Sequence, residues 1–566
     1  MAQASLAQTL PEDIIEDIIF YATNLRKLRR TQAAEWHPEL CQELMPLLGV
    51  CRHWRSVALP VFYLDLFLTT NDDVTAIDRP LRFFHGLTDV ITNGAEHFIR
   101  CARIQVPMAS ILEGKVVDLL SAAPYTDAVF PSAVHLTFGV FGGGDPEGEV
   151  PMFKENAAKF CERILRLFPN VESLNFDVRA MRYTAHDEIM GDIVTGLTKA
   201  RRLGAFDYSG VQSYLHVPEL THLATLSRIS LFVERADGDI IELVHRNAPT
   251  LEYIEIRCVQ LGAFVSLIQD SNGNTVTYPC LKTLYAYAMD YSSTNIRESP
   301  EGTPFPALKH LTCAGEYPFN NDILFRGNSA TLESLELTIT PALLQAAQRY
   351  NVFEKGRYPR LHRVALESWS GFAMDDELAL SVARIPFEVG PNVQVIKVNL
   401  RGDKRENVIL DAIRLTPENS QIRFLNIQDF RLTVFEVVEV IKILPNLRDL
   451  KFWMTEEETA EQDSLSLDAL AQLHTENHPV STRLRSLQFE SRANELARQT
   501  AANLLTVASL APSLQYISMF GLLFDDCKAF FKDVVADPAF DKYAEHLRSI
   551  KYLSGLYRGA ETIPLF

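Results

Sequence analysis

The chain has 566 residues, of which 47% are hydrophobic and 22% are charged, and its net charge is −18. This composition is ordinary for a globular protein. Because a negative field repels phosphate backbones and anionic lipid, we expect no nucleic-acid partner and no membrane partner. No apolar run is long enough to predict a membrane span, and no basic stretch before an apolar core predicts a secretory signal.

The eight cysteines are scattered, and no two of them lie within four residues of each other. This spacing favours neither zinc-ligand pairs nor a dense disulfide framework, and we predict no metal and no cofactor. Reduced thiols are typical of the cytoplasm and the nucleus, so we expect the protein in one or both of these compartments.

The stretch "TLPEDIIEDIIFYA" at residues 9–22 predicts an amphipathic helix. Thr9 and Glu12 fit a capping box, and Pro11 falls in the first turn, where its missing N–H costs little. Helical spacing gathers four aliphatic side chains on one face. They are Ile14, Ile15, Ile18 and Ile19.

The stretch "LLGVCRHWRSVALP" at residues 47–60 predicts a second amphipathic helix, which Pro60 closes. Its apolar positions are in helical register: Leu47, Val50, Cys51, Trp54 and Val57. Neither helix is expected to fold alone, so we assign residues 1–66 to one small helical domain.

Together the two helices resemble the F-box family. That family opens with Leu-Pro, an acidic residue and paired aliphatics, and carries a Val-Cys-x-x-Trp phrase before its last helix. The matching residues are Leu10, Pro11, Glu12, Ile14, Ile15, Ile18, Ile19, Val50, Cys51, Trp54 and Arg55. The sequence departs from the family at about residues 23–46, where an insertion lengthens the connector.

The resemblance implies a docking role for this domain. An F-box binds a Skp-type adaptor, which bridges to a cullin–RING ubiquitin ligase. By the resemblance, the adaptor-binding residues are Leu10, Pro11, Ile14, Ile15, Ile18, Val50 and Trp54. The alternative interpretation is that these side chains form the core of a small cap that seals the first repeat.

A short phrase recurs from about residue 130 onward: apolar, two variable, apolar, one variable, apolar. It reads "VESLNF" at 171, "LSRISL" at 226, "LEYIEI" at 251, "LKTLYA" at 281, "LKHLTC" at 308, "LESLEL" at 332, "LHRVAL" at 361, "VQVIKV" at 393, "IRFLNI" at 422, "LRDLKF" at 447, "LRSLQF" at 484, "LQYISM" at 514 and "LRSIKY" at 547, with weaker copies at 133 and 200. We assign residues 67–130 to a linking and capping region, 131–555 to the repeats and 556–566 to a tail.

The last four residues of each phrase alternate in polarity, which predicts a short strand buried on one face. Helical stretches such as 435–444 and 500–510 separate the phrases. Strand, helix and strand at a period of about 30 residues predict a parallel, concave sheet with helices outside, stacked as an α/β solenoid. The pattern resembles an irregular leucine-rich repeat without a regular Asn after the strand. The alternative is an ordinary doubly wound α/β domain.

Side chains that flank the buried strand positions are expected on the concave face. Several of them are aromatic or arginine, the residue types that dominate binding energy at interfaces. We predict substrate binding by Phe232, Tyr253, Arg257, Tyr285, Tyr287, Phe424, Trp453 and Tyr516. Within this set, we expect one patch from Phe232, Tyr253 and Tyr285. A second patch is expected from Phe424 and Trp453, and the alternative is that loops or a helix cover these rings.

No phosphate loop, metal motif or nucleophile with a positioned base is recognisable, so no catalytic residue is predicted. The resemblances together imply the non-catalytic substrate-recognition subunit of a Skp–cullin–F-box ubiquitin ligase, whose repeats bind the substrate protein. Two alternatives stay open. One is a repeat scaffold that works without a ligase, and the other is a hydrolase-like enzyme on an α/β body.

Overall fold

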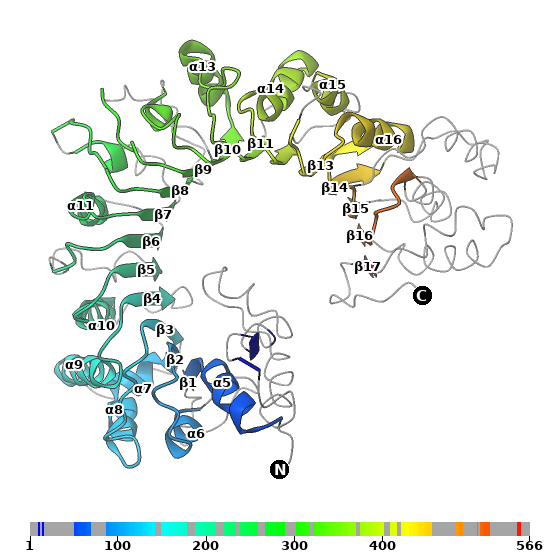
Figure 1. The fold of residues 1–566 in the computed structure, drawn as a ribbon. Coiled ribbons are helices and arrows are strands. Elements are labelled where there is room, and N and C mark those ends of the chain that lie inside the picture. Colours follow the sequence, from blue (N-terminus) through cyan, green and yellow to red (C-terminus); the bar gives the residue numbers. More distant parts are fainter. Residues whose placement is uncertain are drawn as a thin grey trace. The chain divides into compact units, whose positions relative to one another are not determined.

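The structure, a computed structural model, contains two compact units, Met1–Leu267 and Ile268–Phe566. Figure 1 shows their elements. The residues that the structure describes are 10–11, 14–15, 18, 50–69, 86–141, 149–177, 187–210, 220, 222–233, 238–258, 266–270, 272–288, 301–315, 322–368, 374–400, 408–415, 420–454, 483–490, 507, 510–520 and 552–555.

In the first unit the described strands pair in chain order, and every pairing is parallel. The strands are β1 (Asp65–Thr69), β2 (Cys101–Pro107), β3 (His135–Phe141), β4 (Ser173–Asp177), β5 (Ala205–Ser209), β6 (Arg228–Val233) and β7 (Tyr253–Cys258). The helices are α5 (Arg52–Phe62), α6 (Leu87–Thr92), α7 (Met108–Leu112), α8 (Lys115–Ser121), α9 (Val150–Leu167), α10 (Asp187–Leu197) and α11 (Gly238–Arg246). Helices α9, α10 and α11 lie along one face of these strands (Figure 1).

The core of the first unit lies between its strands and helices. In β4, Leu174 and Phe176 are fully buried, whereas Ser173 and Asn175 are half-buried and Asp177 is exposed. The ring of Phe176 lies 5.8 Å from that of Phe138 on β3 and 6.0 Å from that of Phe206 on β5. These edge contacts between aromatic rings link three consecutive repeats.

The second unit repeats the same plan, with each described strand parallel to its neighbours in the chain. Its strands are β8 (Thr283–Ala288), β9 (His310–Gly315), β10 (Ser334–Ile339), β11 (Arg363–Ser368), β12 (Val395–Asn399), β13 (Phe424–Leu432), β14 (Asp449–Met454), β15 (Ser486–Glu490), β16 (Tyr516–Phe520) and β17 (Tyr552–Gly555). Its helices are η5 (Ile323–Phe325), α13 (Pro341–Tyr350), α14 (Asp376–Glu388), α15 (Val408–Arg414) and α16 (Val434–Ile443). Helices α13 to α16 lie on one side of the strands (Figure 1).

This arrangement is an α/β solenoid, and it confirms the predicted fold class. A doubly wound domain would place helices on both faces and would reverse its strand order at one point. Here, within each unit, successive described strands are neighbours in the sheet.

Side-chain caps fix where helices of the second unit begin. The side chain of Thr340 accepts a hydrogen bond from the Leu343 N–H, and Asp375 accepts one from Leu378. Thr433 and Glu436 form a reciprocal capping box at the start of α16. This helix confirms the one predicted at 435–444.

Two copies of the phrase are out of register with their strands. The copy at Ala200 predicts a strand that starts three residues before β5, which begins at Ala205. The first inward residue of β5 is the buried Phe206. The copy at Leu547 has the same offset, because β17 begins at Tyr552. The spacing of the phrase allows this error, since the same apolar spacing fits again three residues later, at Leu203 and Phe206 and at Ile550 and Leu553.

Two strands also precede the segment that we assign to the repeats. Strand β1 pairs with β2, and β2 pairs with β3, so the sheet starts at Asp65 instead of after residue 130. The inward side chains of β2 are Ala102, Ile104 and Val106. Ala102 and Val106 are smaller than the leucines of later copies, and the phrase is correspondingly hard to recognise.

Asparagine connects neighbouring repeats, but from a position before the strand. Asn247 is fully buried, and its side-chain amide donates to the carbonyls of Leu223 and Leu243 at 2.8 and 2.9 Å. Its oxygen accepts from the Leu226 N–H at 2.8 Å, and the nearby Thr250 hydroxyl donates to the Leu226 carbonyl at 2.8 Å. The motif "NAPTLE" at 247 recurs as "NSATLE" at 328, where the Thr331 hydroxyl again donates to the preceding repeat, at the Leu308 carbonyl. Asn328 repeats only the bond to the carbonyl four residues earlier, at Leu324, and its Oδ1 has no partner among the described residues.

Some predicted features fall outside the described residues: the insertion at 23–46, the tail at 556–566, the side chains of Glu12 and Ile19, and most of the predicted helix at 500–510. Within the part of the chain that is described, no helix has the length and apolar character needed to cross a membrane.

Candidate functional site

The face of each sheet opposite its helices carries the side chains predicted to bind a partner, and we call it the open face. In the first unit, the register of β6 and β7 pairs Arg228 with Tyr253 and Phe232 with Arg257. Phe232 is 38% exposed and Arg257 is exposed, whereas Tyr253 is half-buried.

A chain of polar contacts crosses the open face from β5 to β7. The Arg228 Nε donates to the Asp207 Oδ1 at 3.2 Å, and the Arg228 guanidinium lies 3.9 Å from the centre of the Tyr253 ring. The Tyr253 hydroxyl in turn donates to the Glu255 Oε2 at 2.7 Å. This alternation of charges and ring fixes the orientation of all four side chains.

Glu255 is the centre of this network. Its carboxylate also accepts from the Arg257 Nε at 2.7 Å and from the Ser230 hydroxyl at 3.3 Å. Burial raises the pKa of Tyr253, and the hydrogen bond to Glu255 raises it further, so the phenol remains a donor. Burial also raises the pKa of Asp207, although the charge of Arg228 opposes that rise.

The network changes the interpretation of the first predicted patch. Tyr253 faces Arg228 across the strands, and Phe232 lies at the other end of β6, roughly 13 Å further along the strand. The two rings are therefore not cross-strand neighbours. Tyr285 belongs to the second unit, where β8 pairs it with Thr312 on β9. Tyr287, also half-buried, pairs with Ala314.

The second predicted patch is also divided. Phe424 pairs with Asp449, and the Lys451 ammonium lies 5.8 Å from the centre of the Phe424 ring. Trp453 pairs with Arg431 because the register shifts within β13. Phe424 and Trp453 therefore lie at opposite ends of the β13–β14 pair, not side by side.

Tyr516 is the most exposed of the predicted aromatic side chains, with 42% of its surface accessible. It begins β16 and pairs with Ser486 on β15 and with Tyr552 on β17. It therefore lies in the same row of the sheet as Phe424 and at a distance of three strands from it.

The N-terminal helical segment divides its predicted adaptor residues into two groups. Ile14 and Ile18 are 42% and 37% exposed, and Val50 is 47% exposed. Pro11 is also exposed and Leu10 is half-buried.

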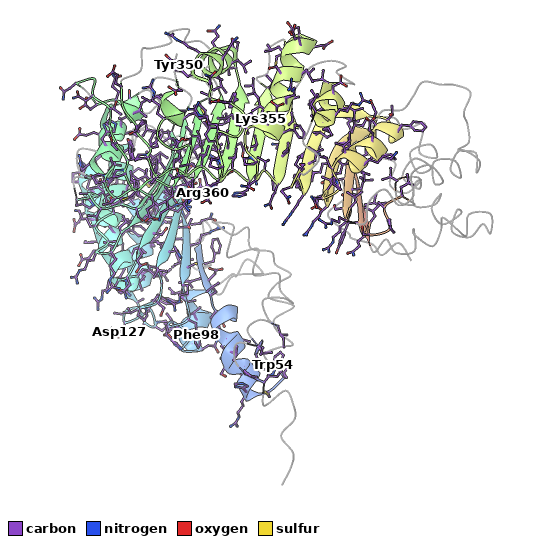
Figure 2. The ribbon with its side chains drawn as sticks, turned by 45° about the horizontal axis from the view of Figure 1, so that its top comes forward. Trp54, Phe98, Asp127, Tyr350, Lys355 and Arg360 are labelled. Carbon is purple, nitrogen blue, oxygen red and sulfur yellow. The ribbon has the colours of Figure 1, made fainter. Side chains whose placement is uncertain are left out.

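Ile15 and Trp54, by contrast, are buried and belong to the interior of this segment. Trp54 lies on α5 (Figure 2). The His53 Nε2 donates to the Leu10 carbonyl at 2.9 Å, which ties α5 to the beginning of the first helical stretch. Ile15 and Trp54 are therefore core residues of this segment, whereas Ile14, Ile18 and Val50 are exposed.

Sequence reasoning missed two further features. One is Asp65, the first residue of β1, whose Oδ2 is buried and has no hydrogen-bond partner among the described residues. Burial raises its pKa to about 6, while a hydrogen bond with Cys101 and the charge of Arg103 oppose the rise. The other is a row of exposed arginines that directly precede β13, β14 and β15. Its only sequence signal is Arg at the same position of three successive phrases.

Titratable groups elsewhere give no sign of an activated nucleophile in the described residues. Burial raises the pKa of the Cys161 and Cys313 thiols to about 12, which keeps them protonated. Among the residues that the structure describes, no group of three His, Cys, Asp or Glu side chains is placed to hold a metal ion.

No family model and no curated protein matches this chain. Among solved structures, the chain resembles two from the Drosophila Toll–Spatzle complex. The first, in the glycosylated form, has a TM-score of 0.33 and 12% identity, and the match covers 87% of this chain and 55% of that chain. The second has a TM-score of 0.32 and 10% identity, covering 88% of this chain and 54% of that one. This chain thus matches about half the length of those chains.

Proposed function

We propose that this protein is a non-catalytic receptor with two binding surfaces. The N-terminal helical segment, which resembles an F-box, docks a Skp-type adaptor and through it a cullin–RING ubiquitin ligase. The open faces of the repeats bind the substrate protein. The coarser part of this proposal, a repeat-based protein-interaction scaffold, rests on the α/β solenoid itself.

The observation that carries the adaptor role is the exposure of Ile14 and Ile18. They stand four residues apart, which places them on one face of a helix, while Ile15 between them is fully buried. Exposed aliphatic side chains on a helix face favour contact with an apolar groove of a partner. Val50 is a third exposed aliphatic side chain of the same segment.

The substrate role is supported by the composition of the open faces. They carry Phe232, Arg257 and Tyr516 as exposed residues, and aromatic and arginine side chains are enriched among interface residues that dominate affinity. In the first unit, hydrogen bonds to Glu255 hold Arg257 and Tyr253 in place before any partner arrives, which lowers the entropy lost on binding.

Binding to a recombinant Skp-type adaptor tests the first half of the proposal. We expect the full-length protein to capture the adaptor and the double variant Ile14→Asp/Ile18→Asp to lose capture by more than about tenfold, because two charges would be buried without partners. Val129→Asp is the matched control, since Val129 is an aliphatic side chain of the same unit that is 40% exposed. Equal capture by all three proteins would refute the adaptor role.

The same assay separates this function from its alternatives. A scaffold that works without a ligase would bind its partner through the repeats but would not bind the adaptor. A hydrolase-like enzyme would also fail to bind the adaptor, and it would turn over a substrate without any added ligase.

A further inference from the structure

Three arginines hold the same position in three consecutive repeats of the second unit. Arg423, Arg448 and Arg485 directly precede β13, β14 and β15. The Arg448 N–H donates to the Arg423 carbonyl at 2.8 Å, and the Arg485 N–H donates to the Arg448 carbonyl at 2.8 Å. With about 4.8 Å between neighbouring strands, this arginine row spans about 10 Å.

The arginine row is exposed, and apart from the electrostatic interaction of Arg448 and Arg485 with Asp449 its charge is not paired within the described residues. All three side chains are exposed, and within the described residues none of the three guanidinium groups forms an ion pair. Earlier in the same unit, the basic residue at the equivalent position forms an ion pair. Lys309, which precedes β9, pairs at 2.9 Å with Glu333, which precedes β10.

The positive charge of the arginine row acts on a residue of the open face. Asp449, the first residue of β14, is half-buried, and burial raises the pKa of its carboxyl. The positive charges of Arg448, Lys451 and Arg485 oppose that rise, so they act at the position of Asp449. Lys451 also lies over the ring of Phe424, 5.8 Å from its centre. The arginine row therefore borders an aromatic part of the open face.

We propose that the arginine row binds an acidic peptide segment of a partner protein, with an apolar side chain of that segment packed near Phe424. Planar guanidinium groups bind carboxylates through two parallel hydrogen bonds, which gives direction as well as attraction. This inference deepens the proposed function and rests on its use of the open face of the second unit as a partner-binding surface.

Charge complementarity favours a short acidic segment over a nucleic acid. The whole chain carries a net charge of −18, so the row is a local exception. A peptide segment with about three carboxylates matches the three charges of the row. A nucleic acid would extend beyond the row, over a surface whose net negative charge repels phosphate.

The probe for this site is a fluorescent hexaglutamate peptide ending in phenylalanine, titrated with the full-length protein and followed by anisotropy. We compare the wild type with the triple variant Arg423→Gln/Arg448→Gln/Arg485→Gln. The control triple variant is Arg349→Gln/Lys355→Gln/Lys442→Gln, which removes the same charge from exposed positions on α13, on α16 and in the connection after α13. Lys355 is labelled in Figure 2.

The wild type is expected to bind the peptide, with a Kd at least about tenfold tighter than that of the row variant and within about twofold of that of the control variant. The single variant Arg448→Gln should lose about threefold. Equal losses in the two triple variants would assign the effect to the general field and overturn the proposal. So would failure of the wild type to bind, or row-dependent binding of hexathymidylate that is tighter than binding of the peptide.

This assay contains no adaptor. Loss of adaptor binding by Ile14→Asp/Ile18→Asp leaves the peptide result unchanged, so failure of the ligase role and failure of the arginine row are distinguishable.

Discussion

At the scale of single residues, burial shifts two side chains of one row of the first sheet toward their neutral forms. The register places Asp65 on β1, Cys101 on β2 and His135 on β3 beside one another. Burial raises the pKa of Asp65 to about 6 and lowers the pKa of His135, for which the charges of Glu172 and Asp207 act in the opposite direction. The row is therefore a place where pH affects the stability of the first unit.

Asp65 predicts a pH dependence with a definite sign. Its folded pKa of about 6 exceeds the ordinary value of 3.8, so the folded state disfavours the ionised carboxylate. The cost is absent below the ordinary pKa, grows as pH rises toward 6 and is then constant. In Asp65→Asn this term vanishes, so the free energy of unfolding of the variant relative to wild type should rise by about 2 kcal/mol between about pH 4.5 and pH 7.5. Urea unfolding at a series of pH values measures the difference, and a difference independent of pH would contradict it.

The sequence pattern predicted which face of the sheet a side chain occupies. It did not predict which neighbouring side chains it contacts on that face. Alternation places Phe232 and Tyr516 on the open face, and both are exposed. The hydrogen bonds from Tyr253 and Arg257 to Glu255 join residues two apart on one strand, so they depend on rotamers that a polarity pattern does not contain. The separation of Phe424 from Trp453 follows from a register shift, which has no signal in the phrase.

At the scale of elements, several neighbouring repeats are joined by side chains that lie before a strand. Asn247 makes three hydrogen bonds to backbone groups. Asn170 makes one, to the Pro131 carbonyl at 2.8 Å. The predicted absence of an Asn after each strand left open what joins neighbouring repeats, and part of the answer is visible in the recurrence of "NAPTLE" and "NSATLE".

These two asparagines provide a matched pair for measurement. Asn247→Ala leaves buried backbone groups without partners and should lower the free energy of unfolding by roughly 3 kcal/mol. Asn170→Ala removes a single more accessible bond and should cost about 1 kcal/mol. Urea unfolding followed by circular dichroism gives both values. Equal costs would show that Asn247 is not a special connection between repeats.

Strand positions were predictable where the phrase fits the sequence in a single register. Copies such as "LESLEL" and "LEYIEI" coincide with β10 and β7, because leucine and isoleucine fill the inward positions. The offset at β5 arises because the same spacing also fits three residues later, from Leu203 to the buried Phe206 and Tyr208. Strand β2 was missed where the small residue Ala102 takes an inward position. Period and polarity identified the solenoid, but they did not choose between overlapping registers.

At the scale of the whole molecule, the proposal assigns two separate tasks to one chain. The exposed aliphatic side chains of the N-terminal segment serve the adaptor, and the open faces of the repeats serve the substrate. The two surfaces share no residue, so substitutions in one should leave the other intact.

Comparative affinity purification from the source cell tests this central claim most directly. We compare the full-length wild type with Ile14→Asp/Ile18→Asp and with Phe424→Ala/Trp453→Ala, and identify the recovered proteins by mass spectrometry. The account predicts that the first variant loses the Skp-type adaptor and the cullin but retains substrates, and that the second variant loses substrates but retains the adaptor. Absence of the adaptor from the wild-type sample, or joint loss of adaptor and substrates in either variant, would contradict it.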